Sequence, residues 1–497
     1  MKLVRESLMW QLLALLFSRL DELVRASFLA RWTGAVWRWL GRQYRCSLLG
    51  ILLGCSSRLN EKLPESLFGR ALNGLLTLPG RILDRSVLVN ALADFSGRWL
   101  TVLLAFCPVL ILSVPYESWN NYSVLYLFLL GLGMLLLSRQ RRLSLREIGF
   151  WPLAFFLLTL GSVLWSADPA DSLRFGVFAC ICALGVLLCV HALDSGKKLL
   201  WVAFGIALGL LVCCAYGLWQ RWSGIEPNAH YTDLSSNASM PGRVYSFFDN
   251  PNSFANIPVL FAPLMLSLFF FSPKLWQKLL FGLAFLLASL CLIMTYTRGA
   301  WLAWAFSLFV FALLVRPRLA PWLAVLALLC LPLLPESILA RFLSIFTGDS
   351  SISSRGPIYR AILRLIKRYP VLGVGLGSTN LRAVLNDLEL YTGGAYFVHG
   401  HNVLFQIWGE SGVLALLSFC LASFFALRDG LRDAFRPAGE EGNLARGVLA
   451  GSACGLLGAL VFGMTDYIWS YPRIMILYWF LFGLLLAAGK LRKGAQQ

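Results

Sequence analysis

The stretch "SFANIPVLFAPLMLSLFFFS", residues 253–272, decides the fold class. It contains no charged side chain and has about the 20 residues that a helix needs to cross the hydrocarbon core of a bilayer. The whole chain of 497 residues is 58% hydrophobic and 14% charged, whereas soluble proteins carry about 25% charged residues. The sequence therefore predicts an all-α polytopic membrane protein.

About twelve apolar runs reach or approach spanning length, all of them after residue 98. They lie near residues 99–114, 122–138, 149–166, 175–193, 199–219, 253–272, 277–296, 299–315, 320–335, 403–427, 446–465 and 474–489. We therefore expect a transmembrane domain over 99–497.

The first 98 residues differ from the rest of the chain. They contain fourteen Lys and Arg residues and seven Asp and Glu residues, and their apolar runs are too short to span. This pattern indicates amphipathic helices on the cytoplasmic membrane face, with a small partner-binding domain as the alternative. No cleavable signal peptide is expected, because acidic residues interrupt the apolar start and no cleavage site follows.

Arginine and lysine residues predict the orientation of the spans. They concentrate in alternate loops, at 139–146, 197–198, 274–278, 316–318 and 428–436, and in the tail at 490–493. The positive-inside rule places these loops and both termini in the cytoplasm. Since most of the net charge of +18 lies in such loops, it fixes topology and gives no reason to expect a nucleic-acid partner.

Two long outer loops follow from this orientation, at about 220–252 and 336–402. The second is basic, with seven Lys and Arg residues against four acids. Long loops escape the positive-inside rule, so this excess suggests an anionic ligand.

Within the second outer loop, "SSRGPIYRAILRLIKRYPVLGVGLGS" (353–378) has the period of an amphipathic helix between Pro357 and Pro370. One face is apolar and the other basic, which predicts a helix lying flat on the outer membrane surface. The apolar face comprises Ile358, Ala361, Ile362, Leu365 and Ile366, and the basic face Arg360, Arg364, Lys367 and Arg368.

Arg355 lies just before this helix, where free backbone N–H groups attract anions. A phosphate site is the interpretation that we favour here, whereas Lys367 and Arg368 suit lipid headgroups. The glycines at 373, 375 and 377 are expected to permit a tight return toward the membrane; they lack the strand–turn–helix context of a dinucleotide site.

Two more arginines are expected on the outer face. Arg298, in "TYTRGAWLAW" (295–304), falls at the junction of two apolar runs, where a charge is costly and usually functional; snorkelling to headgroups is the alternative. Arg243 precedes "DNPN" (249–252), which reads as a turn in which Asn252 and Ser253 cap the next span.

A titratable group sits in "FVHGHNVLFQIWGESG" (397–412). His401 begins a span. Asn402, Gln406 and Glu410 follow at intervals of four, so they share one helix face that should point into the bundle or a cavity. His401 is a candidate general base, with a capping role as the alternative. Glu410 either orients the site or is a structural acid.

Two further features concern pairing and metals. Asp466 and Arg473 flank the last loop and are candidates for a structural ion pair. The twelve cysteines show no metal-ligand spacing, and no histidine pair or acidic cluster suited to a metal is evident, so no metal or other cofactor is expected.

These segments, in this order, resemble the O-antigen ligase and polysaccharide polymerase family over roughly residues 200–490. The residues that carry the resemblance are "FDNPNSFANIPVLFAPL" (248–264), "TYTRGAWLAW" (295–304), "SSRGPIYRAILRLIKRYPVLGVGLGS" (353–378), "HGHNVLFQIWGESGVLAL" (399–416) and "GMTDYIWSYP" (463–472). Nothing is carried over to residues 1–98.

The resemblance implies a GT-C-like glycosyltransferase of the cytoplasmic (inner) membrane, with its active site facing the periplasm or cell exterior. Such enzymes move a glycan from an undecaprenyl-diphosphate carrier to an acceptor glycan or glycolipid, without a metal. Arg298, Arg355 and His401 match the family's motif positions. We expect inverting transfer, with the arginines on the diphosphate and His401 as base. The rival is a transporter of a small anion such as bicarbonate, because some relatives carry that label, although no inverted repeat is visible.

Overall fold

The computed structural model describes most of the chain after residue 58. The described residues are 59–83, 86–120, 147–226, 241–315, 336–343, 355–391, 399–436, 440–469 and 471–494, with isolated positions at 35, 39, 123, 127, 129 and 131. The chain divides into two compact units, Met1–Ser66 and Leu67–Gln497. Of the first unit, the described part contains the 3-10 helix η1 (Leu63–Glu65).

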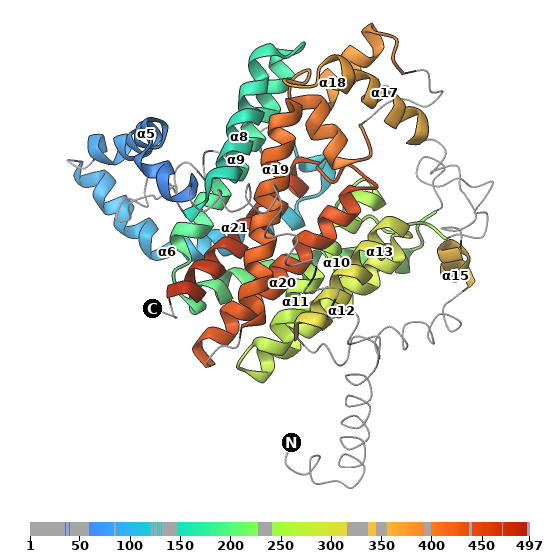
Figure 1. The fold of residues 1–497 in the computed structure, drawn as a ribbon. Helices are drawn as coiled ribbons and strands as arrows, with labels where there is room; N and C mark the ends of the chain where they lie inside the picture. The colour runs from blue at the N-terminus through green and yellow to red at the C-terminus, as the bar shows by residue number, and fades with distance from the viewer. Residues whose placement is uncertain are drawn as a thin grey trace. The chain divides into compact units, whose positions relative to one another are not determined.

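The regular elements among the described residues of the second unit are all helices, and no strand occurs there (Figure 1). Its α-helices are α5 (Leu67–Leu83), α6 (Val87–Ser113), α8 (Phe150–Gly161), α9 (Pro169–Ala192), α10 (Gly196–Ser223), α11 (Pro251–Phe271), α12 (Leu275–Met294), α13 (Arg298–Val315), α15 (Glu336–Leu343), α17 (Arg355–Arg368), α18 (Ser378–Asp387), α19 (Val403–Phe435), α20 (Glu440–Gly463) and α21 (Pro472–Gly494). Two 3-10 helices, η2 (Tyr116–Ser118) and η4 (Ser162–Trp165), complete it. The domain boundary predicted at residue 98 falls inside α6 and stays a prediction.

Eight of the described helices are long and apolar enough to cross a membrane: α9, α10, α11, α12, α13, α19, α20 and α21. Two shorter apolar segments, Trp99–Ser113 and Phe150–Trp165, add to them. Together they coincide with ten of the predicted spans, which confirms a polytopic membrane protein. The expected span at 320–335 lies outside the described residues, as does nearly all of 122–138.

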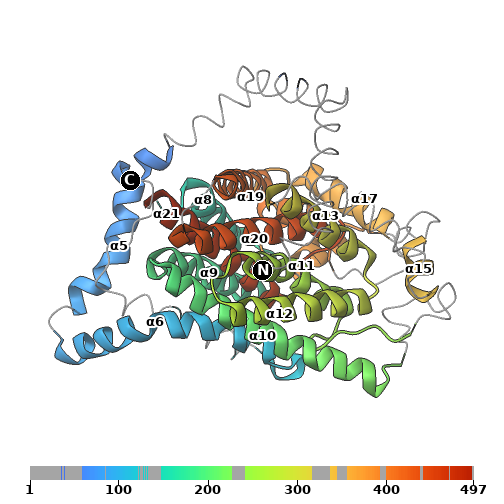
Figure 2. The same ribbon diagram turned by 90° about the horizontal axis from the view of Figure 1, so that it is seen from below.

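Close helix packing holds the centre of the bundle, where α11 packs against α20 and α12 (Figure 2). Gly447, Gly451 and Gly455 lie four residues apart, so they share one face of α20. A side chain at Gly455 would collide with the carbonyl of Leu260 on α11. Small residues at such spacing let membrane helices approach closely, since lipid offers no hydrophobic drive between them.

Contacts between loops define two ends of the bundle. At the first, Arg243 Nε donates to the carbonyl of Thr295 at 2.7 Å, and Asn402 Nδ2 donates to the carbonyl of Met464 at 3.0 Å. We call this the His401 end. At the other, Lys490 Nζ lies 2.7 Å from Glu147 Oε2, and we call it the Lys490 end.

Asparagines start the two central helices at the His401 end. Asn402 Oδ1 accepts from the backbone N–H groups of Leu404 and Phe405, at 2.9 and 3.1 Å. Asn250 Oδ1 accepts from the N–H of Asn252 at 2.8 Å and caps α11. The expectation that Asn252 and Ser253 cap this span is therefore wrong by two residues, because Pro251 takes the first helical position and makes Asn250 the cap.

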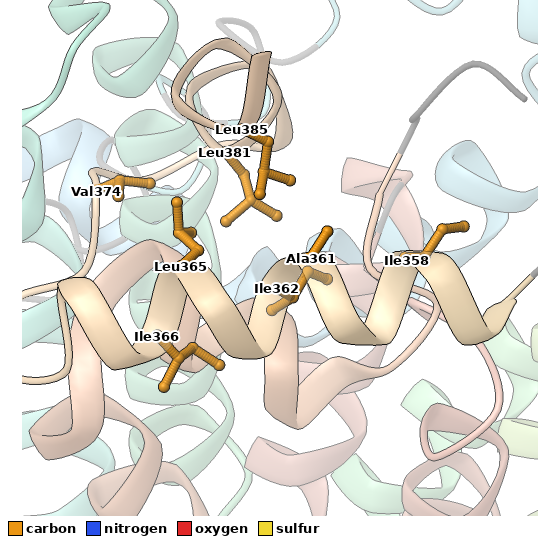
Figure 3. Close-up of a cluster of buried hydrophobic side chains, with 8 residues drawn as sticks. All are labelled: Ile358, Ala361, Ile362, Leu365, Ile366, Val374, Leu381 and Leu385. Carbon is orange, nitrogen blue, oxygen red and sulfur yellow. The ribbon is translucent and has the colours of Figure 1, made fainter. Parts of the chain in front are cut away.

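The predicted amphipathic helix is α17, and its apolar face is buried in protein. Ile358, Ala361, Ile362, Leu365 and Ile366 are all buried and cluster with Val374 and with Leu381 and Leu385 of α18 (Figure 3). The face is therefore not free for lipid, and the expectation that it contacts the membrane is wrong. That the helix lies flat at the membrane surface stays a prediction. Sequence periodicity identifies an apolar face but not what covers it. The basic residues Arg360, Arg364, Lys367 and Arg368 are exposed, as predicted.

The chain returns from α17 to the bundle through the expected glycines. Gly373, Gly375 and Gly377 have φ of 71°, 108° and 112°, a region that favours glycine. Here the loop meets a break in α19 at Gly412, where φ is 82°. The N–H groups of Val374 and Gly375 donate to the carbonyls of Gly409 and Glu410, both at 2.9 Å. The loop thus satisfies carbonyls that the break leaves without helical partners.

Gly412→Ala should destabilise the protein by on the order of 1–3 kcal/mol, because a side chain is strained at this φ and would collide with the carbonyl of Val371. The measurement is the melting temperature of the detergent-purified protein. Gly185→Ala in α9 is the matched control, since an added methyl there meets nothing within 4 Å. Equal melting temperatures for the two variants would contradict this account of the break.

Candidate functional site

A cavity of about 350 Å³ opens at the His401 end. Its lining comes from the segment after α6, from α9 and α11, from the residues before α19 and from the connection between α20 and α21. Chain segments about 350 residues apart thus meet around one space. Its volume lies in the range of about 300–1,000 Å³ that small-molecule sites occupy.

His401 and Asp466 form the polar centre of this lining. His401 Nδ1 lies 3.1 Å from Asp466 Oδ1. The ring of His399 lies against that of His401 at an interplanar angle of 56°, with 4.2 Å between the ring centroids. The backbone N–H of His401 donates to His399 Nδ1 at 3.3 Å. Asp466 was expected beside Arg473; it instead orients a histidine that lies 65 residues earlier in the chain.

Burial and neighbouring charges together set the protonation states of Asp466 and His399. Burial raises the pKa of Asp466, but the hydrogen bond and charge of His401 outweigh burial and keep the pKa of the carboxyl well below its usual range. The positive charge of Arg355 acts in the same direction. Burial lowers the pKa of His399 to about 4, and the charge of His401 adds to this effect. A carboxylate therefore faces His401, and His399 is neutral at pH 7.

The backbone of His401 is fixed in an unusual conformation. Its φ is 45°, which is uncommon for a residue with a side chain. The hydroxyl of Tyr359 on α17 donates to the carbonyl of His401 at 3.0 Å. The N–H of Gly400 donates to Gln406 Oε1 at 2.7 Å. These contacts hold the histidine where α19 begins, which is a strained position of the kind found at functional sites.

Gln406 and Glu410 lie behind the cavity and not on its wall. Gln406 Nε2 donates to Glu410 Oε1 and to Ser378 Oγ, the latter at 3.1 Å. Both side chains are buried, with 0% and 3% exposed. Their shared face points into the bundle, as predicted. The network connects the first residue of α18 to Gly400, which precedes His401.

Arg243 is buried and occupied by protein partners. Its Nη2 donates to Asn252 Oδ1 at 2.6 Å and to Thr297 Oγ1 at 2.9 Å, in addition to the bond with Thr295. It does not line the cavity. Arg243 therefore joins the start of α11 to the connection between α12 and α13, which the sequence did not reveal.

Arg298 and Arg355 begin α13 and α17 and are partly buried. Neither lines the cavity, but both adjoin its polar centre. The charge of Arg355 reaches His399 and Asp466. Gly299, next to Arg298, packs against Thr465, next to Asp466. The arrangement brings the three residues predicted from separate motifs to the same end of the bundle.

His399, His401 and Asp466 could also hold a metal ion, since one ligand atom from each lies within 4.8 Å of the others. The expectation that no histidine pair suited to a metal exists is therefore wrong about geometry. A three-ligand site requires Asp466 beside His399 and His401, and the spacing of these residues in the sequence does not indicate that contact. Two of these ligand positions, His401 Nδ1 and Asp466 Oδ1, are hydrogen-bonded to each other.

Several lining residues have no site role in the sequence prediction, among them Trp119, Asn256 and Arg473. Arg473 is fully buried and donates to the carbonyls of Val114 and Phe247, at 2.7 and 2.6 Å. The expected pairing with Asp466 is therefore wrong: backbone carbonyls from two loops, which no sequence pattern reveals, satisfy this guanidinium.

Acidification from pH 7 to pH 5 should lower the melting temperature of the protein, and His399→Gln should reduce that loss. The pKa of His399 falls from 6.5 to about 4 on folding, so the unfolded state binds more protons between these values and stability decreases as the pH drops through them. The measurement is thermal unfolding in detergent at both pH values. The same decrease in both proteins would contradict the assignment of a neutral, buried His399.

Part of the chain matches a known protein family. No curated protein matches the chain. The family model described as O-antigen ligase matches residues 283–420, a segment that contains Arg298, Arg355 and His401 and the whole of α17 and α18. This match confirms the resemblance of the sequence motifs to the O-antigen ligase family over this part of the chain.

Proposed function

We propose that this protein transfers or polymerises a glycan from an undecaprenyl-diphosphate carrier onto an acceptor hydroxyl at the outer face of the cytoplasmic membrane. Its family domain and its spans already make it a membrane glycan-processing enzyme. The observation that carries the finer proposal is the contact between His401 and Asp466 on the wall of a cavity at the end that bears Arg298 and Arg355.

His401 is proposed as the general base. Asp466 engages its Nδ1, which leaves Nε2 for the hydroxyl of the acceptor. A carboxylate in this place orients the imidazole and stabilises the imidazolium that forms when the proton is taken. The acceptor oxygen then bonds to the anomeric carbon as the bond from that carbon to the diphosphate breaks. Attack opposite the leaving diphosphate inverts the configuration.

Arg355 and Arg298 are proposed to bind the diphosphate. Both stay charged and can donate two parallel hydrogen bonds to phosphate oxygens. They would offset the negative charge that grows on the leaving group. For Arg243, burial and its bonds to Asn252, Thr295 and Thr297 favour a positioning role over the direct phosphate contact suggested by the sequence.

The charges at the Lys490 end support an outward-facing site. Lys490 and Arg492 lie there beside segments that the sequence marks as basic; Arg492 Nη2, for instance, donates to the carbonyl of Arg436 at 3.0 Å. The positive-inside rule puts such an end in the cytoplasm. The His401 end would then face the periplasm or the cell exterior.

One observation bears on the rival function, transport of a small anion. α19 is broken at Gly412, and broken helices near the bilayer centre line the sites of many transporters. In this protein the break is at the tenth residue of a 33-residue helix, so it lies nearer to the His401 end of the bundle than to the Lys490 end. The loop at Val374 and Gly375 occupies the exposed carbonyls. The break thus serves to anchor a loop, so we favour transfer.

His401→Ala should lower glycan transfer by roughly 10²–10⁴-fold, the loss expected for a missing base. Binding of the carrier lipid should persist, because the arginines remain. The measurement is in vitro transfer from undecaprenyl-diphosphate glycan, with carrier binding assayed in parallel. Near-normal transfer would remove the base role and leave His401 as a structural residue.

Arg355→Lys should lower transfer about 10–100-fold, because an ammonium loses the paired hydrogen bonds to phosphate. Arg368→Lys is the matched control: Arg368 ends the same helix, is exposed, and should transfer normally. The readout is the apparent affinity for the carrier together with the transfer rate. An equal effect of the two substitutions would show that Arg355 has no special role.

A further inference from the structure

One wall of the cavity has a chemistry that the proposed mechanism does not use. It combines aromatic rings with carboxamides: Trp119, Tyr467 and Tyr471, with Asn250, Asn252 and Asn256 from the start of α11. The Oδ1 atoms of Asn250 and Asn252 accept from protein groups, but their Nδ2 groups can donate to a ligand. The rings offer flat apolar surface with a polar edge. Burial and the nearby Asp249 raise the pKa of Tyr471, so its hydroxyl stays protonated.

This wall is poorly suited to a phosphate. Of the two arginines that line the cavity, Arg473 donates to two backbone carbonyls and Arg174 lies 3.8 Å from Asp171. The carboxylate of Asp466 stands on the same lining and would repel an anion. An uncharged ligand rich in hydroxyl groups suits the lining better.

Buried polar atoms on this wall have no hydrogen-bond partner among the described residues. They are Trp119 Nε1, Asn256 Oδ1 and Arg473 Nε. Asn256 is 3% exposed and Arg473 fully buried, so the protein shields them from bulk water. Such atoms are costly unless they are partnered. They mark a part of the lining whose polar groups the described protein atoms do not satisfy.

We propose that this wall binds a pyranose ring of the acceptor glycan, with Trp119 as the stacking surface and the asparagines of α11 as hydrogen-bonding partners. The proposal rests on the proposed function, because His401 must reach a hydroxyl of the sugar held here. His401 and this wall line the same cavity, so a bound ring would present its hydroxyl to the base. The diphosphate of the donor would lie on the arginine side, outside this lining.

The first test is direct binding to the purified full chain in detergent. Methyl pyranosides of glucose, galactose and N-acetylglucosamine serve as probes in saturation-transfer NMR, with inorganic pyrophosphate as competitor. At least one glycoside should bind, and Trp119→Ala should weaken it about tenfold. Trp222→Ala, in an 85% exposed residue at the end of α10, should leave binding unchanged. Pyrophosphate should not displace the sugar.

The proposal is overturned if none of the glycosides binds, if Trp119→Ala binds like the wild type, or if pyrophosphate displaces the sugar. Asn256→Leu is a second variant and should also weaken binding; if it does not fold, Trp119→Ala decides. In the transfer assay, Trp119→Ala should raise the KM for the acceptor about tenfold and leave the KM for the donor unchanged. A rise confined to the donor KM would overturn the assignment to the acceptor.

The two proposals fail separately. If glycosides bind in a manner that depends on Trp119 but no transfer occurs, the sugar site stands and the glycosyltransferase function is lost. If transfer occurs but Trp119→Ala changes neither KM nor glycoside binding, the function stands and the sugar site is lost.

Discussion

The structure at the His401 end depends on one constraint. The unpaired backbone groups at helix termini need hydrogen-bond partners. A helix leaves its first N–H groups and its last carbonyls unpaired, and a bilayer does not hydrate them. Here side chains of the candidate site supply the partners. Asn402 caps α19 and also joins Met464. Arg243 satisfies the carbonyl of Thr295. The same bonds that end the helices therefore position the site.

This arrangement separates two charged side chains, which lie outside the cavity lining, from the uncharged surface on part of that lining. Arg298 and Arg355 begin helices beside the polar centre, whereas aromatic rings and carboxamides line the cavity in front of His401. A substrate pair with an anionic half and an uncharged half suits this division. Lipid-linked diphosphate and sugar acceptor are such a pair, so one geometry accounts for both proposals.

The sequence predicted what depends on local pattern and missed what depends on distant contacts. Hydrophobic runs located the spans, and periodicity located the buried face of α17. Glycine spacing located the tight loop at 373–377, because its conformations are ones that other residues avoid. Nothing local indicates that α18 and α19 cover that face, that Arg473 serves the carbonyls of Val114 and Phe247, or that Asp466 meets His401. Each of these contacts depends on how helices pack.

The central claim is that His401 and Asp466 act as a base and its orienting acid, although with His399 they also have the geometry of a metal site. Transfer by the purified protein after dialysis against EDTA tests this most directly, with the metal content measured in the same sample. We predict an unchanged rate in metal-free protein. Loss of transfer that a divalent cation restores would contradict the claim and make the three residues ligands of a catalytic metal.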